Sequence, residues 1–223
     1  FTHYQAAQTH TAPVRAHGRA PLPTNTVPEL APVTPYQHNI ARLQQQDQAT
    51  ARTYWQDKLS GLIAPTPIPI LNQTGETDQT QAEQTRSLTA EQTQAWQAYA
   101  QRQRITLNTL IQAGWASLLG RYSGETDIVF GATTSGRNLP LPGIEQMVGL
   151  FINTLPLRVD LNQPTPALLQ QLQTQQQTDN QYAYTSLADI QNWSDVPNGI
   201  ALFDSLIVFE NYPVDDTLSH NDL

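Results

Sequence analysis

The 223-residue sequence contains no cysteine, so disulfide bonds and thiolate chemistry are excluded as sources of stability or catalysis. Charged residues make up only 13 % of the chain, and the 11 Lys and Arg residues are scattered singly. The formal net charge is -8. Such a chain offers no basic surface of the kind that binds nucleic acid or an anionic membrane.

Long hydrophobic runs are also lacking. No apolar run approaches the roughly 20 residues that a membrane-spanning helix needs, and no cationic and then apolar signal peptide opens the chain. We therefore expect a cytoplasmic protein. The sequence starts at Phe1 rather than Met and ends abruptly at Leu223, which indicates a segment of a longer polypeptide.

The motifs of common catalytic and metal sites are absent. The histidines show no HExxH or paired spacing, so a zinc site is not expected; they are His3, His10, His17, His38 and His220. No Gly-rich loop joins a strand to a helix, so no phosphate cradle is expected. Ser135 lies in TTSGR, which is not a GxSxG nucleophile elbow. The sequence therefore predicts no directly bound cofactor and no complete catalytic set.

The chain does contain a series of periodic segments. Apolar residues at three- and four-residue steps predict helices over 36–62, 89–104, 106–123 and 164–181. Strands are predicted over 127–135, 147–161 and 201–212, and IEQMVG is expected to be a short helical segment before the second strand. Strands separated by helices predict an α/β (α+β) sandwich, with a mixed sheet flanked by helices.

Two features of the helices lead to expectations about packing. The helix over 106–123 carries an apolar stripe that is expected to be deeply packed; its members are Leu107, Leu110, Ile111, Gly114, Trp115, Leu118 and Leu119. The abundant Gln residues lie mostly on the polar faces of the helices, so we interpret these faces as solvated.

The stretch GATTSGR contains the first candidate site residues. Its small residues leave space beside a strand end, Ser135 offers a hydroxyl group, and Arg137 offers a fixed cation. The alternative is a simple strand-to-turn junction, because turns favour Ser and Gly for local reasons. In that case Arg137 lies on the surface or pairs with a carboxylate.

The stretch MVGLFINTLPLRV contains the second candidate, Asn153, which is unusual among the apolar residues of a predicted strand. A buried amide without partners costs about 1–3 kcal/mol, so it must be hydrogen-bonded. It either fastens a neighbouring loop or points into a cavity, where an amide can orient a polar substrate. The pattern alone leaves both possibilities open.

Several of these segments together resemble the condensation domains of nonribosomal peptide synthetases. MVGLFINTLPLRV is similar to the (I/V)GxFVNT-type motif of that family, and PYQHNIARLQQQDQATARTYWQDKL to its YxDYxxWL segment and the following helix. QYAYTSLADIQNWSDVPNGIALFDSLIVFENYP resembles the last two motifs. The resemblance extends from about Tyr36 to Pro213.

The resemblance implies a domain organisation and a fold. Residues 1–35 would be a Pro-rich lead-in from a preceding lobe, 36–213 the C-terminal lobe of a condensation domain, and 214–223 a tail of an incomplete lobe. The family's fold has two lobes, each similar to chloramphenicol acetyltransferase, facing each other across a tunnel.

The resemblance also implies an activity and its partners. Carrier proteins bring aminoacyl or peptidyl groups to the tunnel on phosphopantetheine arms, and the acceptor amine attacks the donor thioester to form an amide. The expected partners are these carrier proteins, the N-terminal lobe and an adjacent adenylation domain. By resemblance, Ser135, Gly136, Arg137, Asn153 and Thr154 line the tunnel, and Asn153 supports the chemistry.

The sequence departs from the family in three ways. The HHxxxDG motif, which carries the general-base histidine, is absent, so the chain alone is expected to be inactive. In YQHNIARL, His38, Asn39 and Arg42 replace the family's Asp, aromatic residue and Trp. The sequence also stops soon after FENYP, before the elements that complete the lobe. An epimerization domain, a degenerate condensation-like domain and a non-catalytic carrier-binding module therefore remain alternatives.

Overall fold

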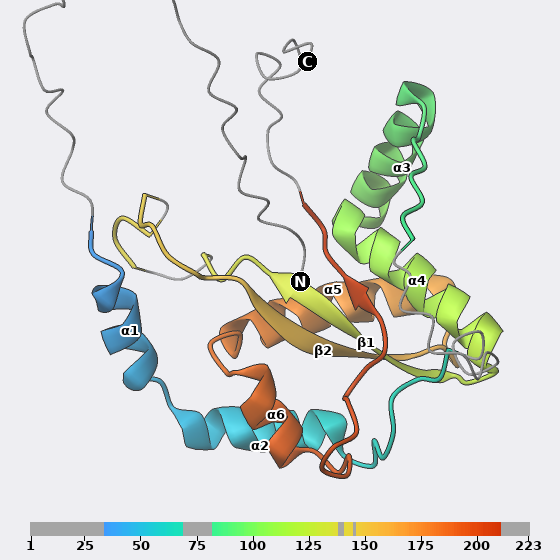
Figure 1. Ribbon diagram of the computed structural model, residues 1–223. Helices are drawn as coiled ribbons and strands as arrows, with labels where there is room; N and C mark the ends of the chain where they lie inside the picture. The colour runs from blue at the N-terminus through green and yellow to red at the C-terminus, as the bar shows by residue number, and fades with distance from the viewer. Residues whose placement is uncertain (1–33, 69–81, 138–140, 145, 211–223) are drawn as a thin grey trace, which may run out of the picture. The chain divides into compact units, whose positions relative to one another are not determined.

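A computed structural model describes residues 34–68, 82–137, 141–144 and 146–210 (Figure 1). Its sheet contains β1 (Asp127–Thr134), β2 (Asn153–Asp160) and β3 (Leu206–Ile207) in the order β2-β1-β3. β2 runs antiparallel to β1, whereas β3 runs parallel to it. The predicted mixed sheet is thus confirmed.

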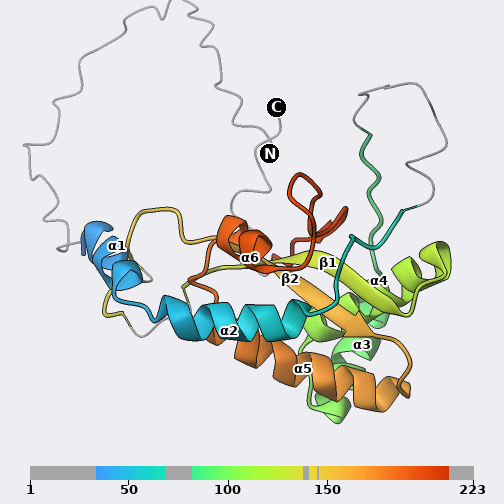
Figure 2. The same ribbon diagram turned by 90° about the horizontal axis from the view of Figure 1, so that it is seen from below.

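Helices cover both faces of this sheet (Figures 1 and 2). The helices of the described residues are α1 (Gln37–Gln44), α2 (Gln48–Leu59), α3 (Ala90–Gln103), α4 (Leu107–Ser123), α5 (Thr165–Gln181) and α6 (Leu187–Trp193), of which α2, α4, α5 and α6 pack on the sheet. On one face, α4 and α5 bury a core with Phe130 and Leu157 of the strands. On the other face, α2 and α6 pack around Trp55, Val129 and Ile190. The predicted sandwich is confirmed. In the described ranges, no helix is long and apolar enough to cross a lipid bilayer.

Capping residues explain where several helices begin. Thr89 and Gln92 form a capping box at the start of α3, as the sequence predicts. The hydroxyl group of Thr106 accepts a hydrogen bond from the Thr109 amide at the start of α4. The single helix predicted over 36–62 is wrong, because Asp47 interrupts it. The Asp47 carboxylate accepts bonds of 3.0 Å from the amides of Ala49 and Thr50 and starts α2 as a separate helix.

Two predicted strands are shorter than expected. The strand predicted over 147–161 begins only at Asn153, because the residues before it form turns and irregular chain. The described part of IEQMVG forms turns and irregular chain rather than a helix. The last strand is limited to Leu206–Ile207, although exposure still alternates from residue to residue around it. Helix α6 was not expected from the sequence.

The packing of α4 differs from the expectation. Its buried residues are Thr109, Gln112, Ala113, Ala116 and Leu119. Of the predicted apolar stripe, only Leu119 is buried, and Leu118 is 41 % exposed. The stripe instead lines a groove of about 740 Å³, here called the apolar groove, whose walls include Trp96, Tyr99, Leu110, Trp115, Leu118 and Ile207.

The interpretation of the Gln-rich faces as solvated is wrong for Gln112, which is 3 % exposed. The predicted lead-in over 1–35 lies almost wholly outside the described residues, as does the tail over 214–223.

Candidate functional site

The candidate residues meet at one end of the β1–β2 ladder. Thr134, the last residue of β1, pairs with Asn153, and Thr133 pairs with Thr154. Ser135, Gly136 and Arg137 follow β1 directly. The antiparallel register therefore brings together two stretches of chain that lie far apart in the sequence.

Gly136 occupies a position that a larger residue cannot take without strain. Its φ of +64° lies in the left-handed region, and a Cβ atom there would lie 1.9 Å from the carbonyl oxygen of Phe151. The glycine lets the turn after β1 approach the chain that leads into β2. Ser135 is exposed, and its hydroxyl oxygen lies 3.4 Å from the Arg137 amide that donates to it.

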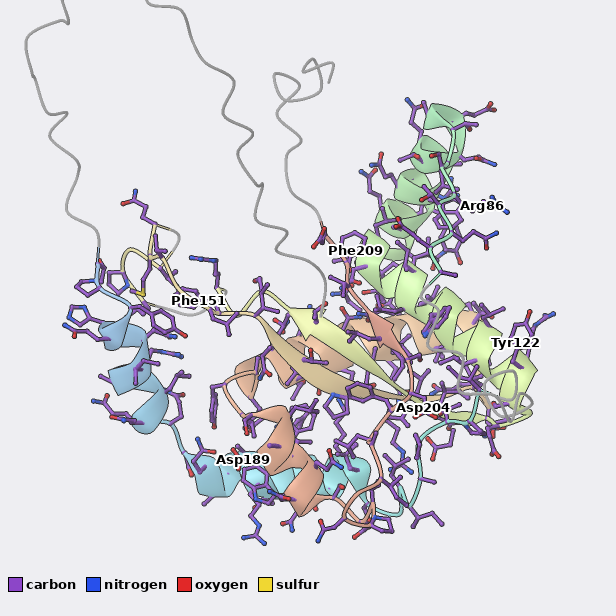
Figure 3. The ribbon with its side chains drawn as sticks, viewed as in Figure 1. Arg86, Tyr122, Phe151, Asp189, Asp204 and Phe209 are labelled. Carbon is purple, nitrogen blue, oxygen red and sulfur yellow. The ribbon has the colours of Figure 1, made fainter. Side chains whose placement is uncertain are left out.

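Arg137 holds the segment before β2 in place. One of its guanidinium nitrogens donates to the carbonyl oxygens of Ile144 and Met147. Its guanidinium carbon lies 4.3 Å from the centre of the Phe151 ring, within cation–π range. Phe151 is labelled on this segment in Figure 3. In the described structure the cation therefore binds carbonyl groups and an aromatic ring rather than a carboxylate.

The amide of Asn153 is fully hydrogen-bonded within the lobe. Its Nδ2 donates to the carbonyl oxygens of Ala183, at 2.8 Å, and of Thr185, at 2.7 Å. Its Oδ1 accepts a bond of 2.8 Å from the Thr154 amide. The geometry thus favours the loop-fastening alternative, in which Asn153 fixes the chain between α5 and α6 against the start of β2. Its role in the chemistry stays a prediction.

A cavity of about 220 Å³, here called the polar cavity, lies beside the same end of the ladder. Its walls include Asn108, Gln112, Ser135, Asp179, Asn180 and Phe209. Of the five predicted tunnel residues, Ser135 alone is among its lining residues. The side chain of Gln112 is buried, and its Oε1 finds no hydrogen-bond partner among the described residues.

Asp179 joins this cavity to a buried ionic cluster. Its carboxylate accepts hydrogen bonds from Lys58 Nζ and from the Tyr54 hydroxyl group. Burial lowers the pKa of the Lys58 ammonium, and the Asp179 charge opposes that shift. Burial raises the pKa of the Tyr54 hydroxyl, and the nearby Asp179 charge raises it further. Both donors bind the Asp179 carboxylate, so its oxygens are satisfied within the protein.

Asn108, Gln112 and Asp179 were not among the site residues expected from the sequence. A second stripe on the helix over 106–123, from Thr109 through Gln112 to Ala116, also follows helical spacing. This stripe indicates a buried face that contains an amide. No local pattern distinguishes Asp179 from an exposed helix-end carboxylate. Among the described residues, no group of three or more His, Asp or Glu side chains is placed to hold a metal ion.

The family model for the condensation domain matches residues 22–222 of the chain. Chondramide synthase cmdD from Chondromyces crocatus is 47 % identical over 186 residues, which cover 82 % of this chain and 5 % of that protein. Bacitracin synthase 3 from Bacillus licheniformis is 36 % identical over 189 residues, which cover 84 % of this chain and 3 % of that protein. The chain thus spans only a small part of these relatives.

Solved structures share the fold. The first condensation domain of the calcium-dependent antibiotic synthetase matches with a TM-score of 0.62 and 18 % identity, over 80 % of this chain and 41 % of that one. The X-domain from teicoplanin biosynthesis matches with a TM-score of 0.57 and 22 % identity, over 76 % of this chain and 39 % of that one.

Proposed function

This chain belongs to the condensation-domain family of the nonribosomal peptide synthetases, and on that premise we propose that it is part of a domain that forms amide bonds. In this reaction the free amine of an acceptor attacks the thioester of a donor, the C–N bond forms, and the donor's thiol leaves with a proton. The family match over residues 22–222 is the observation that carries this proposal.

The substrates in this proposal arrive on carrier proteins. Their phosphopantetheine arms hold the acyl groups, so the chain itself needs no bound cofactor. The N-terminal lobe and an adjacent adenylation domain complete the set of partners within a multidomain synthetase of the cytoplasm. The sequence identity to two synthetases supports this assignment.

The proposal gives the strand-end residues a place in the tunnel wall. Gly136 and Arg137 shape the turn after β1, and Asn153 fixes the start of β2 against the chain at Ala183 and Thr185. These contacts support a rigid wall, which is what two converging substrates require for a productive geometry. The residues act by positioning backbone rather than by proton transfer.

The 223 residues contain no HHxxxDG motif, so the general base must come from outside this stretch. The proposal therefore predicts that the chain alone does not form amides. It contributes a wall and a docking surface, and the domain needs both lobes for turnover.

The test is a single-turnover assay of the whole condensation domain with a loaded donor carrier and a loaded acceptor carrier. Mass spectrometry of the acceptor carrier should show the added acyl group. An acceptor with an acetylated amine is the matched control and should give no product. An inverted donor stereocentre without amide would indicate an epimerization domain. Carrier binding without any product would indicate a degenerate domain or a binding module.

A further inference from the structure

We propose that Tyr36 is a positioning residue for amide formation, because it fixes residues 147–152 against the start of α1. These residues are here called the pre-β2 segment. The inference rests on the proposed function, which gives Arg137 and Asn153 a place in the tunnel wall, and the pre-β2 segment leads directly into Asn153. Tyr36 itself neither contacts a substrate nor transfers a proton in this account.

The described residues support the pre-β2 segment from one side. Met147 and Phe151 point inward and are buried. Val148, Leu150 and Ile152 alternate with them and are 83 %, 76 % and 57 % exposed. Side chains that alternate in this way lie on opposite sides of an extended chain. The contacts on the inner side therefore determine where the segment lies.

Tyr36 supplies several of these inner contacts. Its hydroxyl group donates a hydrogen bond to the carbonyl oxygen of Leu150. Its ring stands at 90° to the ring of Phe151, with the two centres 5.1 Å apart, which is a favourable edge-to-face arrangement. A Cβ atom at Gly149 would lie 2.1 Å from the Tyr36 ring, so the backbone runs close against it. Three consecutive residues thus contact one side chain.

Phe151 is held by Tyr36 together with Arg137. The guanidinium carbon of Arg137 lies 4.3 Å from the centre of the Phe151 ring, and Arg137 reaches the segment from the turn after β1. Ile144, Met147 and Phe151 form a small core of their own, against which Tyr36 packs, apart from the two cores on the sheet. The packing of the sheet therefore does not fix this segment, and Tyr36 is one of the two side chains that do.

The backbone of Tyr36 is itself held by α1. Tyr36 is the N-cap residue of this helix, and its carbonyl oxygen accepts bonds of 2.9 Å and 3.3 Å from the amides of Asn39 and Ile40. Asn39 is buried, which fastens the first turn of α1 to its surroundings. Figures 1 and 2 show the pre-β2 segment beside the start of α1. The helix thus carries a fixed side chain to the proposed tunnel wall.

A positioning role has a kinetic signature that a purely structural role lacks. A small displacement of groups around two reacting substrates lowers the rate of the chemical step strongly. Binding of the carrier proteins does not depend on that displacement, because the carriers dock outside the tunnel. Loss of Tyr36 should therefore lower the maximal rate and leave the half-saturating carrier concentration unchanged.

The experiment measures single-turnover amide formation by the whole condensation domain at increasing concentrations of loaded acceptor carrier, well below the melting temperature of each variant. Tyr36→Ala should lower the maximal rate by about thirtyfold, because all the contacts of the ring are lost. Tyr36→Phe keeps the ring and loses a bond that water can replace, so it should lower the rate by only about threefold. The half-saturating concentration should stay at the wild-type value in both variants.

Leu119→Ala is the matched control, because Leu119 is buried in the core under α4 rather than against the pre-β2 segment. It should melt earlier than the wild type and keep the wild-type maximal rate. A wild-type maximal rate in folded Tyr36→Ala would overturn this inference alone, as would a change in the half-saturating concentration only, or an equal loss of rate in Leu119→Ala. If Tyr36→Ala does not fold, a wild-type maximal rate in Tyr36→Phe would overturn it. No amide from the wild-type domain would overturn the proposed function, and the inference with it.

Discussion

At the scale of single residues, the side-chain amide of Asn153 anchors the chain between α5 and α6 to the sheet. It stands at the first position of β2, where its two N–H groups hold the carbonyl oxygens of Ala183 and Thr185. Thr185 is 1 % exposed, so water cannot easily replace the lost donor. This explains why an amide is placed at the end of the apolar run that precedes it.

Replacing Asn153 with Ala should therefore destabilise the lobe. Three hydrogen bonds are lost, and the carbonyl oxygens of Ala183 and Thr185 lose the donor that Asn153 supplies, so the free energy of unfolding should fall by about 2–3 kcal/mol. Urea unfolding of the chain measures this change. Asn198→Ala is the control, because Asn198 is exposed, and it should stay within about 0.5 kcal/mol of the wild type. Equal unfolding midpoints for the two variants would contradict the anchoring role.

Gly136 allows a sharper comparison, since a second glycine shares its backbone conformation. Gly136 and Gly61 have φ values of +64° and +74°, but a Cβ atom would meet the Phe151 carbonyl only at Gly136. Gly61→Ala should cost about 1 kcal/mol for the left-handed conformation, and Gly136→Ala about 3 kcal/mol because the chain must also shift. Thermal unfolding of both variants tests this. Similar losses would show that the close approach to Phe151 is not tight.

At the scale of elements, the start of α2 depends on Asp47. The side chain of Thr50 donates to its carboxylate, as do the amides of Thr50 and Ala49, and these bonds lower the pKa of Asp47 below its ordinary value of 3.8. The ionised cap favours the helix in two ways, through these bonds and through the helix dipole.

The stabilisation of α2 by the Asp47 cap should therefore be lost in acid. Because the pKa is lower in the folded state, the stabilisation is complete above about pH 4 and is lost as the pH falls through the folded-state value. Asp47→Ala should melt earlier than the wild type at pH 7, and the difference should shrink steadily below pH 4. Asp47→Asn, which can still cap, is the control and should show a weaker pH dependence. A difference that stays constant from pH 7 to pH 2.5 would contradict this account.

Elements differ in how far the sequence could predict them. The helices over 89–104 and 106–123 were predictable because a cap and a strict period lie within a few residues of each other. The break at Asp47 was missed, since a local side-chain bond overrides a weak apolar pattern there. The short β3 depends on pairing with β1, which is a contact distant in sequence that periodicity does not encode.

For the candidate site, the sequence predicted residues that the structure brings close together, but not their contacts, and their place in a tunnel stays a prediction. The motif resemblance pointed to Ser135, Gly136 and Asn153, and β-strand register does bring these residues to one end of the sheet. The partners of Arg137 and Asn153 are carbonyl groups, which every residue has, so composition cannot identify them. Gln112 looked like any other surface Gln until tertiary packing buried it.

At the scale of the whole molecule, the apolar groove leaves apolar side chains open to solvent. Trp96 and Leu118 are 42 % and 41 % exposed in the apolar groove between α3, α4 and β3. Apolar patches of this kind tend to associate with another surface. The matched structures contain more chain than these 223 residues, because this chain covers only 39 % and 41 % of them.

The chain studied by itself should thus self-associate through the apolar groove. Sedimentation velocity should show a weight-average coefficient that rises with concentration, and Leu118→Lys should reduce this rise because it places a charge in the groove. Ile63→Lys, at a site that is 69 % exposed outside the groove, is the control and should leave association unchanged. A concentration-independent coefficient for the wild type would contradict this expectation.

The central claim, that this chain is part of an amide-forming domain, is tested most directly by single-turnover product formation. The whole condensation domain and the 223-residue chain are each mixed with the same loaded donor and acceptor carriers, beside a sample without protein. The account predicts that the whole domain transfers the donor acyl group to the acceptor amine and that the chain alone matches the protein-free sample. Amide formation by the chain alone, or none by a folded whole domain that binds both carriers, would contradict it.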